Sequence, residues 1–394
     1  MLTIDEARDR VLALVRPLGP PEAVPIGEAH GRVVAAELRA AGDVPPFPSS
    51  AMDGWATTAG PAGRRLRIDG ESRAGHPAPT TVAPDTAVRI STGGAVPGGA
   101  EGVLRVEDSA EDDGHVELRA EVAVGQNVRE AGEDQRAGTL VLAPGTVLGP
   151  PELAAAVTAG VAAVPCAPRP RVAVLCTGDE LRAPGAPLAP GEIHNSNAPA
   201  LAALVARAGG ELVLAGVVPD DRAETERLLA QGLDRADVLC VSGGVSVGPH
   251  DHVKPALTAL GVAEDFWRVS LQPGKPTWFG TREDSLVFGL PGNPVSAMVT
   301  FTLFARPALR ALQGATDAPR GRARLTETVR RAPDRTQAVR VVLSAADDGT
   351  LEARTTGPQG SHLVSSLLGA QALAFIPLGE GELAAGTVVE TVVL

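Results

Sequence analysis

The stretch Arg171-Val172-Ala173-Val174-Leu175-Cys176-Thr177-Gly178-Asp179-Glu180 is the clearest indication of fold class in this chain. Its apolar half is typical of a strand buried on both faces, and the glycine and carboxylates that follow are typical of a polar loop. Three later apolar runs have the same character: 212–218, 238–242 and 285–290. Helical patterns near 198–208 and 222–235 separate the first three runs. This alternation predicts an α/β domain with a parallel sheet over residues 169–318.

The N-terminus predicts an amphipathic helix. Thr3 and Glu6 form a capping box ahead of a helical apolar pattern that Pro17 closes. The apolar positions of this pattern are Ala7, Val11, Leu14 and Val15. The first residues are acidic and lack the apolar core of a secretion signal, and no apolar run reaches the roughly 18 residues that span a bilayer. We therefore expect a cytoplasmic protein that does not act at a membrane.

The rest of the chain is richer in β-like segments. Between 23 and 149, glycine and proline divide the sequence into short β-like pieces, and a helix with proline in its first turn is predicted from Pro150 to about Gly160. Alternating segments after Gly321 predict a small C-terminal β domain. The expected fold class is α/β and multidomain, with β-rich domains before the parallel-sheet domain and a β-barrel-like domain after it. The expected domains are 1–40 with 135–168, 41–134, 169–318 and 319–394.

Length, charge and cysteine content limit the function classes. A chain of 394 residues is expected to form three or four domains. Its 47 acidic and 35 basic residues give a net charge of −12, which argues against nucleic acid or an anionic membrane as the main partner. The spacing of Cys166, Cys176 and Cys240 matches neither a zinc site nor a disulfide framework, so buried thiols in a reducing compartment are expected.

Polar and glycine-rich segments follow each predicted strand of the sheet. They are Thr177 to Glu180, Pro219 to Asp221, Ser242 to Gly244, and Pro291 to Pro294. In an open α/β sheet, ligands bind beyond the carboxyl ends of the strands, so these segments are the candidate site. Adjacent glycines let the backbone approach phosphate or pterin oxygens, although a tight turn explains them equally well. The P-loop and dinucleotide-binding motifs are both absent from the sequence.

Three carboxylates, Glu180, Asp220 and Asp251, would meet at one edge of the sheet if their strands are neighbours. A phosphate beside them requires a bridging cation, and an oxygen-rich cluster without cysteine favours Mg²⁺ over Zn²⁺. Helix capping or a solvated turn is the competing interpretation for Asp220 and its neighbours Asp179 and Asp221. His250 and His252 flank Asp251 but are weaker candidates for metal ligands.

Lysine is rare in this chain. Only Lys254 and Lys275 are lysine among the 35 basic residues, and both follow the glycine-rich segment 242–248. Lysine binds an anion as a compact point charge, so these two and Arg268 are candidate anion-binding residues. Lys254 could instead pair with Asp251, three residues earlier on the predicted helix.

Taken together, the motifs resemble the molybdopterin molybdotransferase family, to which the gephyrin E domain belongs. The resemblance extends over nearly the whole chain, and it is strongest in these segments: Pro46 to Ala56, Arg89 to Gly93, Gly132 to Asp134, Thr177 to Leu181, Ser242 to Gly248, Pro273 to Pro276, Gly289 to Ser296 and Gly360 to His362. It implies four domains, an elongated homodimer, and partners that handle molybdopterin. It also implies hydrolysis of adenylylated molybdopterin with insertion of molybdate into the dithiolene, which gives molybdenum cofactor and AMP.

The resemblance also implies residue roles. Glu180, Asp220 and Asp251 would hold a metal or the molybdate region, with Mg²⁺ expected and Zn²⁺ as the alternative. Other site residues in the expected 169–318 domain would hold the pterin ligand or its oxyanions. They are Ser242, Gly243, Gly244, Val245, Ser246, Gly248, Arg268, Lys275, Pro291, Asn293 and Pro294. Asp53 and Thr92 would reach the site from the partner subunit, and Asp134 matches the acidic member of Gly-Glu-Asp.

Two positions depart from the family pattern, and two alternative functions stay open. Gln272 stands where many members have lysine, which removes a cation, and Trp55 replaces the usual tyrosine. Molybdopterin adenylyltransferases share the α/β domain type but usually have threonine where this chain has Val245. A non-catalytic scaffold of the same fold is the other alternative. No hydroxyl has an evident His/Asp pair, so we expect positioning and electrostatics to drive the chemistry.

Overall fold

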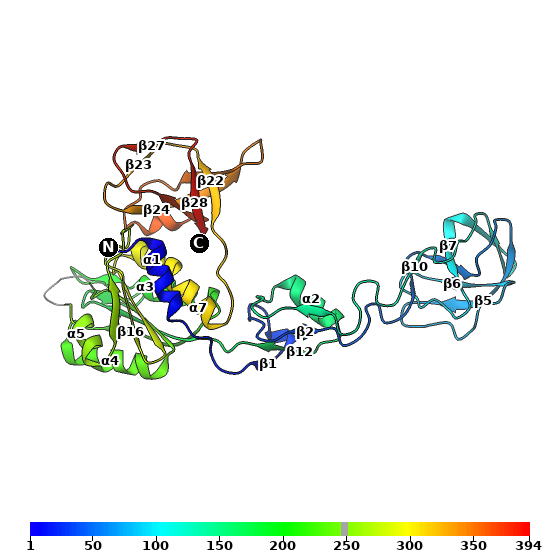
Figure 1. Cartoon of the computed structure of the whole chain (residues 1–394), viewed down its shortest axis with the longest axis horizontal. Coiled ribbons are helices and arrows are strands. Elements are labelled where there is room, and N and C mark those ends of the chain that lie inside the picture. The colour runs from blue at the N-terminus through cyan, green and yellow to red at the C-terminus, as the bar shows by residue number, and fades with distance from the viewer. Residues whose placement is uncertain (246–250) are drawn as a thin grey trace. The chain divides into compact units, whose positions relative to one another are not determined.

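The computed structural model of the chain describes residues 1–245 and 251–394. The chain forms two compact units (Figure 1). Unit 1 comprises Met1–Glu22, Gly31–Ala35 and Ala167–Leu394, and unit 2 comprises Ala23–His30 and Ala36–Cys166. The predicted α/β and C-terminal β domains both lie in unit 1, and the β-rich region lies in unit 2.

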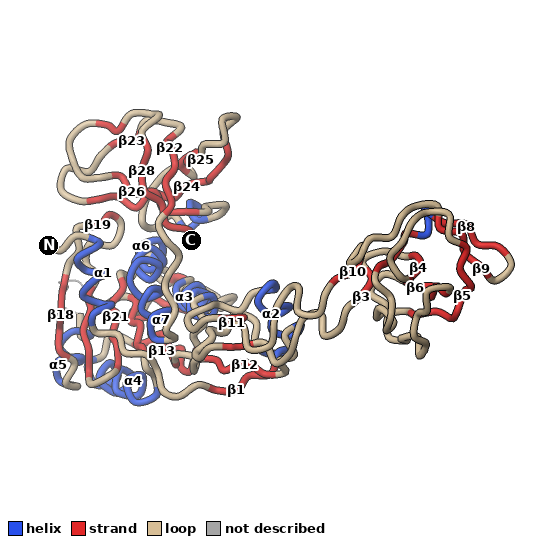
Figure 2. Tube along the Cα trace, turned by 45° about the vertical axis from the view of Figure 1, so that its right-hand side comes forward, coloured by secondary structure: helices blue, strands red, loops and turns tan. Residues whose placement is uncertain are grey.

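Unit 1 is built around a six-stranded sheet in the order β16-β13-β17-β21-β20-β18. Figure 2 draws strands of this sheet in red, with helices such as α3, α4 and α7 in blue beside them. The strands are β13 (Arg171–Thr177), β16 (Glu211–Val218), β17 (Val238–Ser242), β18 (Ala263–Trp267), β20 (Trp278–Arg282) and β21 (Ser285–Leu290). The four strands expected from the sequence run parallel to one another, whereas β20 runs antiparallel to both β21 and β18. The parallel α/β sheet is therefore confirmed, with two added strands that make it mixed.

Helices cover both faces of this sheet. They are α3 (Asn197–Arg207), α4 (Arg222–Arg235), α5 (Val253–Ala259), α6 (Pro294–Thr300), the π-helical turn η3 (Phe301–Ala305) and α7 (Arg306–Leu312). Alternate residues of β13 face opposite sides: Val174 packs in the cluster with α3 and η3, and Leu175 packs in the cluster with α4 and α5. Alternation of side chains along a strand thus divides the core into two layers. The bounds of α3 and α4 agree with the predicted ranges within a residue.

The outermost strand corrects one expectation. Residues 212–218 were expected to be buried on both faces, but β16 is an edge strand, with Leu212 39% and Val217 40% exposed. An apolar run fits an edge strand as well as a central one, so its sequence could not reveal that one neighbour is missing.

One helical run is more apolar than the sequence analysis allowed. Pro294–Leu312 is 19 residues long and, by length and composition alone, apolar enough to cross a membrane. Most of it is buried in the core of unit 1, where Phe301 and Phe304 are fully enclosed. The apolarity is therefore that of a core helix, and the expectation that no run reaches this length is wrong.

The C-terminal part of unit 1 is a closed five-stranded barrel. Its strands are β22 (Gly321–Leu325), β24 (Thr336–Ala345), β25 (Leu351–Thr355), β26 (Ala372–Ile376) and β28 (Val388–Val393). The order β24-β25-β22-β28-β26 closes because β26 also pairs with β24. The short strand β19 (Leu271–Gln272), from the loop before β20, pairs with β24, and β23 (Val329–Arg330) pairs with β27 (Glu382–Leu383). The expected barrel-like domain is confirmed.

The first helix begins as predicted and ends early. In α1 (Ile4–Ala13) the Thr3 hydroxyl accepts from the Glu6 N–H, and the Glu6 carboxylate accepts from the Thr3 N–H. Ala7 and Val11 are buried. Leu14 is the C-cap and is 41% exposed, so the helix stops before the position that Pro17 was expected to close.

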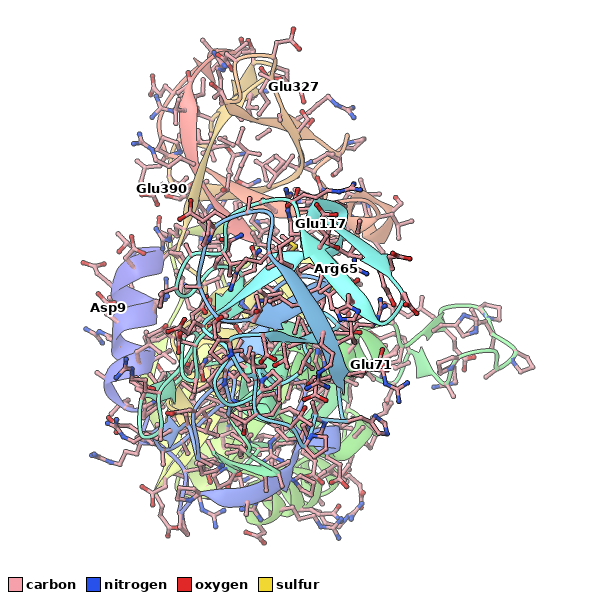
Figure 3. All side chains as sticks on the ribbon, turned by 90° about the vertical axis from the view of Figure 1, so that its right-hand side faces the viewer. Asp9, Arg65, Glu71, Glu117, Glu327 and Glu390 are labelled. Atoms are coloured by element: carbon pink, nitrogen blue, oxygen red, sulfur yellow. The ribbon has the colours of Figure 1, made fainter. Side chains whose placement is uncertain are left out.

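Unit 2 contains a second six-stranded sheet in the order β7-β4-β6-β5-β9-β8. Its strands are β4 (Gly54–Thr57), β5 (Arg65–Ser72), β6 (Thr86–Ile90), β7 (Gly102–Arg105), β8 (Ser109–Asp112) and β9 (His115–Leu118). Polar and apolar residues alternate: Leu66 and Val116 are buried, while Arg65 and Glu117, which pair across β5 and β9, are exposed (Figure 3). This alternation is typical of a sheet with one solvated face.

The remaining elements of unit 2 are short. Helix α2 (Pro150–Thr158) begins with proline as predicted. Three two-stranded ladders accompany it: β1 (Glu22–Pro25) with β12 (Ala163–Cys166), β2 (Leu38–Arg39) with β11 (Leu140–Leu142), and β3 (Ser49–Ser50) with β10 (Val128–Arg129).

Candidate active site

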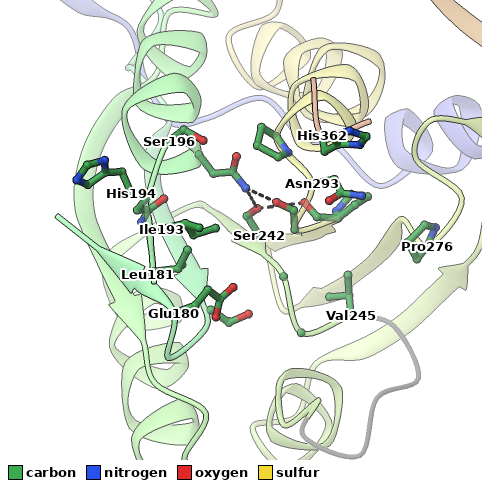
Figure 4. Close-up of a pocket in the computed structure, with 18 residues that line it drawn as sticks. Glu180, Leu181, Ile193, His194, Ser196, Ser242, Val245, Pro276, Asn293 and His362 are labelled. Carbon is green, nitrogen blue, oxygen red and sulfur yellow. Dashed lines mark hydrogen bonds between the residues drawn. The ribbon is translucent and has the colours of Figure 1, made fainter. Parts of the chain in front are cut away.

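A pocket of about 540 Å³ lies at the carboxyl edge of the parallel strands (Figure 4). Cys176 pairs with Ser242 and Ser242 pairs with Leu290, so the loops after β13, β17 and β21 emerge side by side. The short strands β14 (Leu181–Arg182) and β15 (Ile193–His194) form another part of the wall. The lining includes predicted residues Glu180, Ser242, Gly243, Gly244, Val245, Pro291, Asn293 and Pro294. The structure thus brings eight of the predicted site residues together.

The glycine pair of this pocket has no room for side chains. Gly243 and Gly244 have φ angles of +96° and +64°, which strain any other residue. A Cβ on Gly243 would lie 2.4 Å from the Thr177 hydroxyl, and a Cβ on Gly244 would lie 2.4 Å from a Val253 methyl group. The pair therefore leaves bare backbone at the pocket, as a close approach to a ligand requires.

Asn197, which the sequence analysis missed, holds three of the pocket segments together. Its side-chain amide donates to the Ser242 hydroxyl at 2.8 Å and to the Gly292 carbonyl at 2.7 Å. Ser242 in turn donates to the Pro291 carbonyl at 3.1 Å. The start of α3, the end of β17 and the turn after β21 are therefore cross-linked by one buried network (Figure 4). Asn197 also has a buried side-chain oxygen without a hydrogen-bond partner among the described residues.

A second hollow, of about 320 Å³, surrounds Lys275. It shares Pro276, Pro291 and Asn293 with the first pocket. Its other polar side chains are those of Gln272 and Ser296, together with three residues of the C-terminal barrel to which the sequence had given no role: Arg335, Gln359 and Ser361. The Asn293 amide donates to the Ser361 hydroxyl at 2.9 Å. The barrel therefore contributes a basic and a hydroxyl group beside Lys275.

A buried arginine supports the barrel side of this hollow. Arg340 is fully buried, and burial lowers the pKa of its guanidinium to about 10. It donates to the Ser366 hydroxyl at 3.0 Å and to the Gly360 carbonyl at 3.3 Å. Gly360 lines the hollow beside Ser361, so Arg340 fixes the backbone of that wall.

The three predicted metal ligands are not gathered. Glu180 lines the first pocket and is exposed, and Asp220 is exposed with its backbone N–H donating to an Asp179 carboxylate oxygen. Asp251 precedes α5 and acts electrostatically on Lys254. Within residues 1–245 and 251–394, no group of three or more His, Cys, Asp or Glu could hold a metal ion. The chain as described does not supply the three-carboxylate site.

Capping explains one neighbouring carboxylate. Asp221 is the N-cap of α4, and its side chain accepts from the Glu224 N–H at 2.9 Å. This agrees with the alternative interpretation of Asp221 as a cap.

Arg268 lies at the end of β18, where its guanidinium stacks 3.9 Å from the centre of the Trp267 ring. Of the glycine-rich segment, Ser246 and Gly248 lie outside the described residues, as does His250.

Asp53, Thr92 and Asp134 all lie in unit 2. One Asp53 oxygen accepts from the Thr92 N–H at 2.7 Å and from the Thr92 hydroxyl at 3.1 Å. The Asp134 N–H donates to the Val44 carbonyl, and its side chain is exposed. Asp53 and Thr92 are therefore a hydrogen-bonded pair within their own unit.

The cysteines are buried in the cores, as expected. All three lie within the described residues and form no disulfide. Burial raises the pKa of the Cys176 thiol to about 11 and that of Cys240 to about 12, which keeps both protonated and unreactive.

Comparison with known proteins matches the whole length of the chain. Family models describe residues 2–160 as a MoeA N-terminal region (domains I and II), 173–311 as a probable molybdopterin-binding domain, and 322–394 as a MoeA C-terminal region (domain IV). The molybdopterin molybdenumtransferase of Haemophilus influenzae is 34% identical, with 99% of this chain and 98% of that protein covered. Molybdopterin molybdenumtransferase 2 of Mycobacterium tuberculosis is 36% identical, with 97% of each covered.

Solved structures agree. The crystal structure of a molybdopterin biosynthesis MoeA protein from Pyrococcus horikoshii has a TM-score of 0.84 and 28% identity, and the match covers 100% of both chains. The family models, the curated relatives and the solved structure extend through both units, so the resemblance seen in the motifs is confirmed. The chain belongs to the MoeA family of molybdopterin molybdenumtransferases.

Proposed function

We propose that this chain completes molybdenum cofactor biosynthesis: it hydrolyses adenylylated molybdopterin and inserts molybdate into the dithiolene, which gives molybdenum cofactor and AMP. One observation carries the proposal, namely that a glycine-floored pocket and a hollow with Lys275 and Arg335 lie side by side and share a wall. The glycine-floored pocket suits a pterin ligand, and the hollow with its two basic side chains suits an oxyanion.

The pocket residues have distinct tasks in this proposal. Gly243 and Gly244 offer bare backbone against which the pterin can lie, and the Pro291-Gly292-Asn293-Pro294 turn forms the wall between pterin and oxyanion. Lys275 and Arg335 attract molybdate electrostatically in a chain whose net charge is −12. Ser361 and Gln359 supply neutral hydrogen-bonding groups beside them.

Catalysis proceeds without a side-chain nucleophile. Ser242 is 2% exposed, and its hydroxyl already donates to the Pro291 carbonyl and accepts from Asn197. Water therefore attacks the phosphoanhydride, and the site holds the substrate and stabilises the charge that develops. Glu180 is the carboxylate in the pocket, and it is exposed to that water.

Three further expectations extend the proposal: a homodimer, partner proteins and a metal ion. A homodimer would let Asp53 and Thr92 complete the site of the partner subunit, and molybdopterin-handling proteins would deliver and collect the ligand in the cytoplasm. Magnesium is expected to assist. Because the described residues gather no three-carboxylate site, any metal requirement would depend on substrate phosphates as further ligands.

The adenylyltransferase alternative is not favoured, because the molybdenumtransferases of Haemophilus influenzae and Mycobacterium tuberculosis align with 99% and 97% of this chain. An activity assay distinguishes an enzyme from a non-catalytic scaffold of the same fold. The test incubates the protein with adenylylated molybdopterin, molybdate and magnesium, and measures AMP release together with cofactor formation. Absence of both products would refute the proposed function.

Glu180→Gln tests the pocket carboxylate. The substitution keeps size and hydrogen bonding but removes the charge, so AMP release is expected to fall at least ~100-fold, as for loss of a general acid–base or charge-stabilising group. Asp221→Asn, a cap on the same edge, is the matched control and should retain most of the activity. Full activity of Glu180→Gln would remove Glu180 from the mechanism, and repeating the assay without magnesium measures the metal requirement.

A further inference from the structure

A charged cavity lies at the opposite edge of the sheet from the glycine pocket. Arg171 begins β13 and pairs with Glu211, which begins β16, and the N–H of Asp237, directly before β17, donates to the Arg171 carbonyl at 2.8 Å. These three residues therefore form a row across the amino ends of neighbouring parallel strands. They line a cavity of about 380 Å³ that shares no residue with the glycine pocket or with the hollow around Lys275.

Arg32 lines the same cavity from the segment Gly31–Ala35 of unit 1. Its side chain is 10% exposed, and its Nη2 donates to a Glu22 carboxylate oxygen at 2.7 Å and to the Ala167 carbonyl at 2.9 Å. Its Nε is buried and has no hydrogen-bond partner among the described residues. Because an unpaired buried donor is costly, a guanidinium held in this way at a cavity wall indicates that a group from outside the chain completes the site.

Two further charged side chains of the cavity, one of each sign, lack a direct partner. Arg169 and Glu211 are exposed, and in the part of the chain that the structure describes neither side chain makes a hydrogen bond or an ion pair. The other two carboxylates of the lining, Glu22 and Asp237, each accept from an arginine of the same cavity at 2.7 Å. The cavity therefore offers guanidinium donors together with one available carboxylate acceptor.

This combination of groups distinguishes among oxyanions. Guanidinium groups bind the oxygens of phosphate, sulfate and molybdate alike. Of these three ions, only phosphate keeps a proton at neutral pH. A carboxylate accepts a hydrogen bond from that proton, whereas it repels an oxyanion that has none. A phosphate monoester has its second pKa at about 6, so at pH 8 it has also lost its last proton.

We propose that this cavity is a binding site for inorganic phosphate. Arg32 and Arg169 bind the phosphate oxygens, and Glu211 accepts the hydrogen bond from the proton that remains on the ion. The site is separate from the pterin pocket and from the hollow around Lys275, and it does not rest on the proposed function.

Bound phosphate is expected to stabilise the segments that meet at this cavity. Glu22 is the last residue of unit 1 before the chain first enters unit 2, and Ala167 is the first residue after its last return. Arg32 bonds to both, so a ligand that fixes Arg32 also fixes these two segments. A ligand that binds only the folded state raises Tm, so phosphate should raise it and sulfate at equal ionic strength should not.

The experiment titrates full-length protein carrying Lys275→Gln with inorganic phosphate at pH 8, by isothermal titration calorimetry. This background removes the lysine of the other oxyanion hollow. Sulfate, molybdate and glycerol 3-phosphate should each bind at least about tenfold more weakly than phosphate. Adding Arg169→Gln should weaken phosphate binding about tenfold or more, as loss of a charge-assisted hydrogen bond does. Arg222→Gln is the matched control, because Arg222 is an exposed arginine of α4 outside the cavity and should leave phosphate binding unchanged.

Glu211→Gln tests the acceptor. Loss of its charge should bring the affinity for sulfate within about threefold of that for phosphate. Unchanged phosphate binding in Arg169→Gln, or binding of sulfate or glycerol 3-phosphate as tight as that of phosphate before Glu211 is changed, would overturn the proposal. Arg169 and Glu211 are exposed, so both variants should fold, and thermal melting followed by circular dichroism checks this. A wild type that releases no AMP would refute the proposed function and leave the phosphate result standing.

Discussion

At the scale of single residues, Asn197 shows how one amide can stabilise a site built from distant segments. Replacing it with alanine leaves the Gly292 carbonyl without its donor and removes the link between α3 and β17. A buried polar group that loses its partner costs about 1–3 kcal/mol. Alanine also removes the unpaired side-chain oxygen of Asn197, which offsets part of this cost. We therefore expect Asn197→Ala to lower the free energy of unfolding by roughly 1–2 kcal/mol. Urea denaturation followed by circular dichroism measures this change.

The matched control for that prediction is the preceding residue. Ser196 is exposed, lines the same pocket and makes no capping hydrogen bond, so Ser196→Ala should change stability by less than about 0.5 kcal/mol. A double-mutant cycle of Asn197→Ala with Ser242→Ala should give a coupling energy of about 0.5–3 kcal/mol. Independent effects of the two substitutions would show that the hydrogen bond contributes nothing to stability.

At the scale of elements, the turn after β17 depends on its two glycines. Gly243→Ala adds both a strained φ angle and a Cβ that collides with Thr177, so pterin binding should be lost and the free energy of unfolding should fall by about 1–3 kcal/mol. Gly261→Ala, just after α5, has a similar φ of +81° but nothing within 4 Å of the added Cβ. It separates the backbone cost from the collision. Equal destabilisation by the two variants, with ligand binding intact in Gly243→Ala, would contradict this account.

Some features of the helices and strands could be predicted from the sequence, and others could not. Local signals, such as the Thr3–Glu6 capping box and the helical spacing of 222–235, depend on neighbours in the chain, and the structure confirms them. The edge position of β16 depends on a missing neighbour, which no local pattern encodes.

Site residues divide in the same way. Glu180 and the glycine pair follow buried strands, so topology alone places them at the pocket. Arg335 and Ser361 reach Lys275 only because the C-terminal barrel packs there, through contacts more than 60 residues apart such as Asn293 with Ser361. Asn197 carried a weak signal, because an Asn-Ser-Asn run before a helix is also an ordinary helix start.

At the scale of the whole molecule, the proposed homodimer makes a prediction about mixed subunits. The Asp53 and Thr92 pair lies in unit 2, whereas the pocket carboxylate Glu180 lies in unit 1. If each site combines unit 2 of one subunit with unit 1 of its partner, a heterodimer of Asp53→Asn and Glu180→Gln has one intact site. Random assembly of equal amounts would then restore about a quarter of wild-type cofactor synthesis, because half of the two-fold dimers are mixed and each has one working site.

The control mixture tests whether this recovery reflects a shared site. Asp53→Asn with Thr92→Ala places both defects in the same half of the site, so every heterodimer would have two defective sites and no activity should return. Co-expression with two affinity tags isolates the heterodimers, and AMP release is measured on the purified species. Recovery in both mixtures would indicate general stabilisation by the partner, and recovery in neither would place the complete site within one subunit.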